Sequence, residues 1–198
     1  MKIAITGSSG LIGTALIDAI HKRGDTPIRV VRSAPGANDL QWDIGKGSIE
    51  AEKLEGIDAV VHLAGEGIGD AKWSPQQKKA IRESRTMGTD LLAKTLARLD
   101  SPPSVLVSGS AIGFYGDRGE TKVSEQSAGG TGFLPDVVTA WEAAAEPAID
   151  AGIRTAFMRS GVVLSPKGGA LKEQLPFFKA GIGGKIGDGS QYLSLIHI

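Results

Sequence analysis

The chain opens with Met1 to Gly13, and this stretch, MKIAITGSSGLIG, decides the fold. Its apolar run at residues 3–5 is short and β-branched, as expected of a buried parallel strand. Glycines follow at G-x-x-G-x-x-G spacing, and an apolar helical pattern begins at Leu11 and Ile12. The sequence therefore predicts a strand, a glycine turn and the start of a helix in direct succession.

This turn has the form that binds the diphosphate of a dinucleotide. Gly7 allows the sharp turn out of the strand, Gly10 lets backbone N–H groups approach a pyrophosphate, and Gly13 lets the helix pack close to the sheet. The free N–H groups and the positive end of the helix dipole favour an anion there. Hydroxyl groups that can add hydrogen-bond donors are those of Thr6, Ser8 and Ser9. A glycine-rich turn is also ordinary loop chemistry, but this position favours dinucleotide binding.

Composition excludes several classes of protein. The chain has 198 residues, 41% of them hydrophobic and 22% charged, which suits one globular domain. Lys plus Arg and Asp plus Glu both total 22, so no basic field attracts nucleic acid or a membrane surface. Without cysteine there is no disulfide and no thiolate nucleophile, and we expect no metal site. The N-terminal apolar stretch is too short for a signal sequence, which predicts a cytoplasmic protein.

Strand patterns alternate with helical patterns along the whole chain. The predicted strands after the first are residues 27–32, 39–44, 58–65, 104–108 and 154–159. The predicted helices are residues 11–23, 75–99, 135–149 and 168–179, with a weak helical segment at 49–54. The alternation predicts an α/β fold, a doubly wound parallel sheet with helices on both faces, formed by residues 1–198 as a single domain.

The end of the second predicted strand indicates which dinucleotide binds. In this fold an acidic residue there binds the ribose 2′-hydroxyl of NAD, whereas an arginine can hold the 2′-phosphate of NADP. Arg32 stands at that point, and no acidic residue is adjacent to it. A solvated arginine at a strand end is the alternative, but after the glycine turn we favour NADP(H).

Other residues have ordinary explanations beside a functional one. His62 has no acidic partner at useful spacing, so it is predicted to be a packed strand histidine. Gly65 and Gly67 can let the backbone pass close to a cofactor, although a simple turn would look alike. The cations Lys78 and Lys79 are expected on a solvated helix face.

An ordered set of motifs gives the chain a family resemblance. They are TGSSGLIG, HLAGEGI, SRTMGT at residues 84–89, SGSAIGFYG, WEAAAEPA and RSGVVLSPKGG from Arg159. With them the chain resembles the short-chain dehydrogenase/reductase superfamily and, within it, the atypical NADP-binding branch labelled nucleoside-diphosphate-sugar epimerase family. The resemblance implies a Rossmann-type fold, NADP(H) as cofactor and a small-molecule substrate. A homodimer is left open.

The resemblance and the turn together assign residues to a site. The expected cofactor-binding residues are Gly7, Ser9, Gly10, Leu11, Ile12, Gly13, Arg32, Leu63, Ala64, Gly65 and Arg85. The expected substrate pocket consists of Ser110, Tyr115 and Trp141. For Trp141 the alternative is a core tryptophan.

The chain departs from the superfamily in its catalytic residues. The superfamily uses a Ser, a Tyr that transfers a proton, and a Lys four residues after the Tyr. Ser110 matches the Ser, but Trp141 and Ala145 occupy the expected Tyr and Lys positions. An indole N–H is only a donor and alanine carries no charge, so neither can replace them. Neither tyrosine of the chain, Tyr115 or Tyr192, has a lysine four residues later.

Two functional hypotheses follow. The first is an NADP-dependent oxidoreductase or epimerase with catalytic Ser110 and a different proton carrier: Tyr115, Glu142, Arg85 or a water held by Ser110. The second is an NADP-binding protein with a regulatory or assembly role and no chemistry. Tyr115 can instead pack beside the cofactor, Glu142 can lie on a solvated helix face, and Arg159 can pair with an acid at a strand end.

The last stretch of the chain is predicted to belong to the substrate side. Residues 185–190 are glycine-rich and are expected to approach the substrate cleft as a loop, and residues 191–198 are strand-like. In the family that the chain resembles, such a segment leads into a further C-terminal portion. We therefore expect residues 160–198 to begin a substrate-binding portion that is incomplete here.

Overall fold

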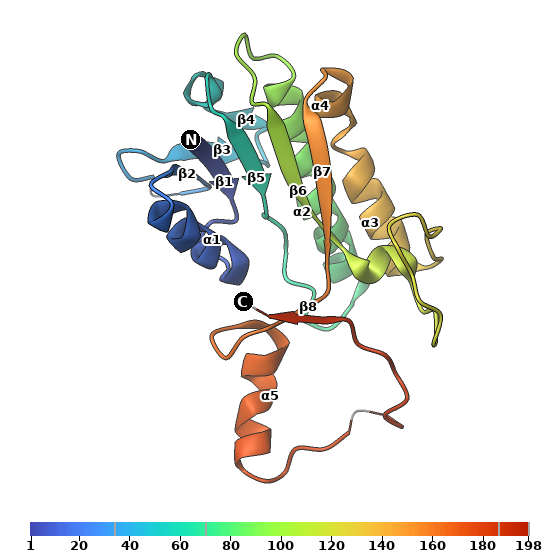
Figure 1. Ribbon diagram of the computed structural model, residues 1–198. Helices are drawn as coiled ribbons and strands as arrows, with labels where there is room; N and C mark the ends of the chain where they lie inside the picture. The colour runs from blue at the N-terminus through green and yellow to red at the C-terminus, as the bar shows by residue number, and fades with distance from the viewer. Residues whose placement is uncertain (34, 70, 186, 198) are drawn as a thin grey trace.

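A computed structural model describes residues 1–33, 35–69, 71–185 and 187–197 (Figure 1). Its main sheet has seven strands in the order β4-β3-β2-β1-β5-β6-β7. At the centre, β1 (Lys2–Thr6) pairs in parallel with β2 (Thr26–Val31) on one side and β5 (Ala59–His62) on the other. The chain thus leaves β1 in one direction and later continues in the other, and open α/β sheets bind ligands at such a switch point.

The remaining strands extend the sheet on both sides. Beyond β5 lie β6 (Val105–Ala111) and β7 (Arg154–Ser160), both parallel to their neighbours. Beyond β2 lie the parallel β3 (Leu40–Asp43) and the antiparallel β4 (Ser48–Ile49). The parallel order confirms the doubly wound, Rossmann-type fold predicted from the alternating pattern.

Helices cover both faces of the sheet because alternate strand residues are apolar on each side. On one face, Ile3 and Ile5 of β1 pack with Ile20 of α1 (Leu11–Lys22). On the other, Ala4 packs in a larger core that includes residues of α2 (Pro75–Leu96) and α4 (Glu146–Asp150). A further helix, α3 (Phe133–Ala143), packs beside α2 (Figure 1).

The prediction of one continuous helix over residues 135–149 is wrong. The structure has α3 and α4 instead, separated at Ala144 and Ala145. Pro147 has no N–H to continue the helical hydrogen bonds, and its ring crowds the preceding turn, so the helix is interrupted just before it. The interruption ends α3 shortly after Trp141 and Glu142, and it places Ala145 in the apolar core.

Other boundaries differ from the predictions at element ends. The strand predicted at residues 58–65, β5, ends at His62, and α2 ends at Leu96 rather than at 99. β6 continues to Ala111, beyond the predicted end at 108. The weak helical segment is the 3₁₀ helix η1 (Ala51–Leu54), and η2 (Ile112–Tyr115) follows β6.

The C-terminal part lies apart from the main sheet, beyond the carboxyl ends of its strands (Figure 1). It consists of β8 (Val162–Leu164), β9 (Leu195–His197) and α5 (Gly169–Lys179). β8 and β9 pair in parallel, as a separate two-stranded sheet. None of the α5 residues is buried. That residues 160–198 begin a substrate-binding portion stays a prediction, and residue 198 lies outside the described residues.

In the part of the chain that the structure describes, no helix has both the length and the apolar character needed to cross a membrane.

His62 is a packed strand histidine, as predicted, and it joins β1, β5 and α2. Its Nδ1 lies 2.7 Å from Thr6 Oγ1, and its Nε2 lies 2.9 Å from Thr89 Oγ1. Thr6 Oγ1 already accepts the N–H groups of Leu63 and Ala64, so its own proton is directed to Nδ1. The histidine is therefore neutral with its proton on Nε2. Thr6 is fully buried by these contacts, so it is not the phosphate donor expected from the sequence.

Burial gives His62 a measurable effect on stability. It lowers the pKa of His62 from 6.5 to about 4, so between these values the unfolded chain binds the extra proton and the folded protein does not. Stability is therefore lost as the pH falls from 6.5 toward 4. We expect His62 to account for a decrease of about 2 kcal/mol in the free energy of unfolding between pH 7 and pH 5.

Urea unfolding at both pH values tests this in the wild type, in His62→Gln and in His21→Gln, which replaces an exposed histidine of α1. His62→Gln should be less stable at pH 7 but should lose the extra pH dependence, whereas His21→Gln should keep it. A pH dependence unchanged in His62→Gln would contradict the assignment.

Candidate functional site

The glycine turn between β1 and α1 is closely packed, and no side chain would fit at two of its positions. Gly7 has φ of +64°, and a Cβ atom there would lie 2.7 Å from the backbone carbonyl of Leu63. A Cβ atom on Gly13 would lie 2.3 Å from the Gly7 carbonyl oxygen. These contacts agree with the roles predicted for both glycines.

The start of α1 is open to a ligand. Gly10 is its N-cap residue, and because glycine has no side chain, no side-chain hydrogen bond caps this end. The first N–H groups of an uncapped helix need an acceptor, and an anion supplies one. The exposed Ser9 precedes this helix start, whereas Ser8 is buried.

Two cavities meet at this turn. The first, of about 320 Å³, extends from the turn to the end of β6, where Gly109, Ser110 and the α3 residue Trp141 line it. The second, of about 470 Å³, extends over the ends of β2 and β3. Both are lined by Gly7, Gly10 and Leu63. A dinucleotide has the matching form, with one nucleotide on each side of a central diphosphate, so the residues present fit such a cofactor.

The second cavity contains two arginines, only one of which is neutralised. Arg29 donates two hydrogen bonds to Asp39, which also accepts the N–H of Gly36 at 2.7 Å. The Arg29 guanidinium holds the pKa of Asp39 below its usual range, so this pair is ionised. Arg32, in contrast, is exposed, and its guanidinium has no hydrogen-bond or ion-pair partner among the described residues.

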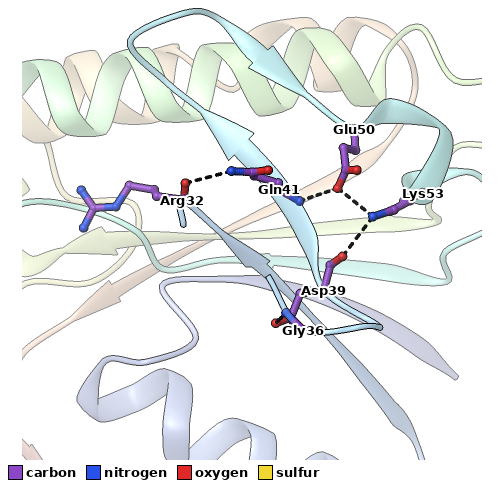
Figure 2. Close-up of polar contacts among 6 residues, drawn as sticks. All are labelled: Arg32, Gly36, Asp39, Gln41, Glu50 and Lys53. Atoms are coloured by element: carbon purple, nitrogen blue, oxygen red, sulfur yellow. Dashed lines mark hydrogen bonds and ion pairs between the residues drawn. The ribbon is translucent and has the colours of Figure 1, made fainter. Parts of the chain in front are cut away.

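Figure 2 shows the hydrogen bonds among the polar residues near Arg32. Lys53 donates to Glu50 at 2.9 Å and to the backbone oxygen of Asp39 at 3.3 Å, and Glu50 also accepts the N–H of Gln41. The side-chain Nε2 of Gln41 donates to Arg32 at its backbone oxygen, 3.4 Å away, and not to its guanidinium. The Arg32 side chain points away from this group, so no acid of the group neutralises it (Figure 2).

In the first cavity, Ser110 is the start of a hydrogen-bonded series. Its hydroxyl donates to Glu142 Oε1 at 2.5 Å. Arg159 of β7 holds the same carboxylate with two hydrogen bonds of 2.8 Å, and it donates a third, of 3.0 Å, to the Tyr115 hydroxyl. Glu142 is therefore held in place by a serine and a bidentate arginine, and the alternative that it lies on a solvated helix face is wrong. That Arg159 pairs with an acid is confirmed.

The charges of this series follow from its contacts. Burial raises the pKa of Glu142, but the Arg159 and Ser110 hydrogen bonds outweigh it, so the net pKa lies below its usual range. The pKa of Arg159 is raised chiefly by its hydrogen bonds to Glu142. Because the carboxylate has no proton to donate, the proton shared with Ser110 belongs to the serine. The remaining lone pairs of Ser110 Oγ are thus free to accept a hydrogen bond from a ligand.

Tyr115 is buried in contact with Arg159. It is 7% exposed, its ring is 5.3 Å from the Arg159 guanidinium, and it is not among the residues that line the two cavities. A catalytic role for Tyr115 stays a prediction, and the structure gives it no direct access to the first cavity.

Trp141 and Ala145 have separate environments. Trp141 lines the first cavity at the end of β6, where a Cβ atom on Gly109 would lie 3.3 Å from its ring. Ala145 is fully buried in the core and does not face the cavity. Arg85 of α2 lies over the Trp141 ring, with its guanidinium carbon 5.1 Å from the ring centroid.

Most of the cofactor-binding residues predicted from the sequence come together in these cavities. Leu63 lines both, Ala64 and Gly65 line the second, and Leu11 and Ile12 line the first. Arg85 lines neither, although a Cβ atom on Gly65 would contact its side chain at 3.5 Å.

Sequence reasoning missed several lining residues. These are Ser33, Ile44 and Ser84 in the second cavity and Ser160, Val162, Val163, Gly169 and Ala170 in the first. Ser33 could have been found from its place beside Arg32. Ser84 lies in the motif SRTMGT, and Ser160, Val162, Val163 and Gly169 lie in RSGVVLSPKGG. These motifs indicated the family but not which of their side chains face a cavity, because that depends on how the segments pack over the glycine turn. Ile44 and Ala170 lie outside the quoted motifs.

The fold and this site define a dinucleotide-binding protein of the Rossmann type. Residues 3–135 match the family model described as "NAD dependent epimerase/dehydratase family". The chain belongs to this family, and the resemblance to the atypical short-chain dehydrogenase/reductases is confirmed.

Curated relatives support the assignment. The chain is 40% identical to epimerase family protein Mb2239 of Mycobacterium bovis, over 99% of this chain and 65% of that protein. It is 36% identical to the epimerase family protein SDR39U1 of Homo sapiens, over 100% of this chain and 67% of that protein. The chain thus spans about 65% of the length of the first of these relatives.

Two solved structures are close to this one. The nucleoside-diphosphate sugar epimerase from Corynebacterium glutamicum has a TM-score of 0.88 and 41% identity, covering 100% of this chain and 41% of that chain. The human epimerase family protein SDR39U1 (isoform 2), solved with NADPH, has a TM-score of 0.89 and 36% identity, covering 100% of this chain and 66% of that chain.

The contact between Gly13 and Gly7 gives a stability prediction. Gly13→Ala would place a methyl group against a backbone oxygen that cannot move aside without shifting the turn. We expect a loss of about 1–3 kcal/mol in the free energy of unfolding, measured by urea denaturation. Gly184→Ala is the matched control, because nothing lies within 4 Å of a Cβ there, and it should change stability by less than about 0.5 kcal/mol. Equal stabilities of the two variants would contradict the packing argument.

Proposed function

We propose that this chain binds NADP(H) and acts as an oxidoreductase or epimerase of the atypical short-chain dehydrogenase/reductase type on a small-molecule substrate. The observation that carries the proposal is the pair of cavities that share the glycine turn. One is lined by Arg32, whose guanidinium has no partner among the described residues, and the other is lined by Ser110. The human relative solved with NADPH supports the choice of cofactor. The homodimer and the cytoplasmic location expected from the sequence stay predictions.

Each part of the cofactor has residues suited to it. The glycine turn and the uncapped start of α1 would hold the diphosphate. Arg32, with Ser33 beside it, would hold the 2′-phosphate, because Arg29 is already neutralised by Asp39. The first cavity would receive the nicotinamide beside Ser110 and Trp141. When bound, the nicotinamide supplies hydride transfer to or from the substrate.

Ser110 and Glu142 would handle the proton that accompanies this transfer. With its own proton directed to Glu142, Ser110 Oγ accepts a hydrogen bond from a substrate hydroxyl. As that alcohol is oxidised, its proton passes to Ser110 Oγ while the serine proton passes to Glu142 Oε1. Arg159 keeps the carboxylate in position and ionised before the transfer. The reverse sequence donates a proton to a carbonyl that is being reduced.

A second candidate function is a non-catalytic NADP(H)-binding protein with a regulatory or assembly role. It is favoured by one observation: Trp141 and Ala145 replace the Tyr and Lys of the superfamily, and Ala145 is buried away from the cavity. Turnover separates the two candidates, because only the first requires the cofactor to change its oxidation state.

Arg32 predicts a preference for the phosphorylated cofactor. NADPH should bind more tightly than NADH, and Arg32→Ala should weaken NADPH binding by roughly ten- to a hundredfold while leaving NADH binding unchanged, because a charge-assisted contact is lost. Arg98→Ala, which removes an exposed arginine outside both cavities, is the control and should have no effect. Titration of nicotinamide fluorescence gives the affinities. Equal affinities of the wild type for the two cofactors would exclude the assignment.

The proposed proton path predicts that Glu142 matters more than Tyr115. Glu142→Gln and Ser110→Ala should each lower turnover by roughly a hundred- to ten-thousandfold with NADPH affinity unchanged. Glu146→Gln, an exposed acid of α4, is the control for Glu142. Because the pKa of Glu142 is lowered, wild-type alcohol oxidation should stay constant as the pH falls toward the ordinary range of glutamate.

Turnover is measured by nicotinamide absorbance with sugar nucleotides, alcohols, ketones and aldehydes. If Tyr115→Phe abolishes turnover and Glu142→Gln does not, Tyr115 is the proton carrier and the proposed path is wrong. Tight NADPH binding with no turnover of any of these compounds would favour the non-catalytic candidate.

A further inference from the structure

Arg85 is a partly buried cation without a counter-ion. Its Nη1 donates to the backbone oxygen of Ile81 at 2.9 Å, within the same helix. No carboxylate lies within ion-pair distance of it in the ranges that the structure describes, and the exposed Glu66 interacts with it only at longer range. Burial lowers the pKa of Arg85 because no close anion compensates for the lost solvent. Its remaining N–H groups have no acceptor among the residues that the structure describes.

Trp141 adds a second donor without an acceptor at the same place. The Arg85 guanidinium lies over its ring, and the ring is 8% exposed. Its indole Nε1 is one of two buried side-chain nitrogen or oxygen atoms without a hydrogen-bond partner among the described residues. The ring also lies against the backbone of Gly109, next to Ser110. Trp141 lines the first cavity, and Arg85, which lines neither cavity, stacks on its ring, so two donors without an acceptor among the described residues lie side by side next to that cavity.

The chemistry of these donors defines what would satisfy them. A buried donor without an acceptor destabilises the folded protein, so structures normally provide an acceptor. A guanidinium presents several N–H groups in a planar fork that matches the oxygens of a carboxylate or phosphate. The stacked indole adds a flat surface that limits solvent access to one side of the cation. An anionic ligand group is the natural acceptor for this arrangement.

We propose that Arg85 and Trp141 form a binding subsite for an anionic group of the substrate, a carboxylate or a phosphate. The inference rests on the proposed function only in placing the cofactor. In the proposed function, the glycine turn would hold the diphosphate of NADP(H) and Arg32 would hold its 2′-phosphate. Its nicotinamide ring has no anionic group to offer Arg85. The anion therefore belongs to the substrate, not to the cofactor as the sequence suggested for Arg85.

The indole N–H of Trp141 provides a direct probe of the subsite. In protein labelled with ¹⁵N-tryptophan, the three tryptophans give separate indole signals, and Trp141→Phe identifies that of Trp141. With NADPH present in saturating amount, inorganic phosphate and acetate are titrated in turn. We expect a saturable shift of the Trp141 signal with at least one of the two anions, while the exposed Trp73 signal stays in place.

Arg85→Met should weaken the binding of that anion by roughly tenfold or more, the effect of losing one charge-assisted contact. Arg82→Met is the matched control, because Arg82 lies on the same helix but is exposed, and it should change the affinity by less than about twofold. Arg85→Lys retains the positive charge but not the planar guanidinium, so its anion affinity should lie between those of Arg85→Met and Arg82→Met. Circular dichroism checks whether Arg85→Met folds. If it does not, Arg85→Lys still tests the effect of Arg85 on anion affinity.

Several outcomes would overturn the subsite. They are the absence of a saturable Trp141 shift with both anions, an equal effect of Arg82→Met, or a tenfold loss of NADPH affinity in Arg85→Met without any anion effect. The last result would make Arg85 a cofactor-binding residue. If NADPH does not bind the wild type, the proposed function fails, but the same titrations without cofactor still decide whether Arg85 holds an anion at Trp141.

Discussion

The close approach of α1 to the end of β1 is the constraint on which the rest of the site depends. Gly13 leaves no space for a Cβ atom against the Gly7 carbonyl, and Gly7 in turn lies against the backbone of Leu63 at the end of β5. These contacts fix the start of α1 over the point where the strand order reverses. Because both cavities share the residues of this turn, its position sets the position of both halves of the site.

The arginines that have an acidic partner help to identify those that are available to a ligand. Arg29 is held by Asp39 and Arg159 by Glu142, so each of these cations has its positive charge compensated inside the protein. Arg32 and Arg85 differ because no acid within ion-pair distance compensates either of them in the described part of the chain. Arg32 lines the second cavity just after β2, and Arg85 lies against Trp141, which lines the first. The distribution suits a ligand with the 2′-phosphate at one end and a charged substrate at the other.

The replacement of the usual Tyr and Lys changes how a proton can be moved. Trp141 can donate a hydrogen bond but cannot carry a proton in either direction. The next residue, Glu142, carries an ionised carboxylate directly against Ser110. Because Ser110 lines the cavity and Glu142 is one hydrogen bond away from it, the carboxylate can receive a proton through the serine without facing the substrate itself. The proton path that we propose therefore requires one serine, one acid and the arginine that orients it.

The sequence by itself determined the alternation of the main parallel strands with helices, the glycine turn and the place of Arg32, because these depend on local apolar periodicity and on residues adjacent in the chain. The short strands β4 and β8 were not predicted. The sequence did not determine the interruption at Pro147, the pairing of Ser110 with Glu142 and Arg159, or the stacking of Arg85 on Trp141. Those partners come from different strands and helices, and α2, α3, β6 and β7 meet only when the sheet forms. Tertiary packing alone could decide which charges are neutralised and which remain free to bind a ligand.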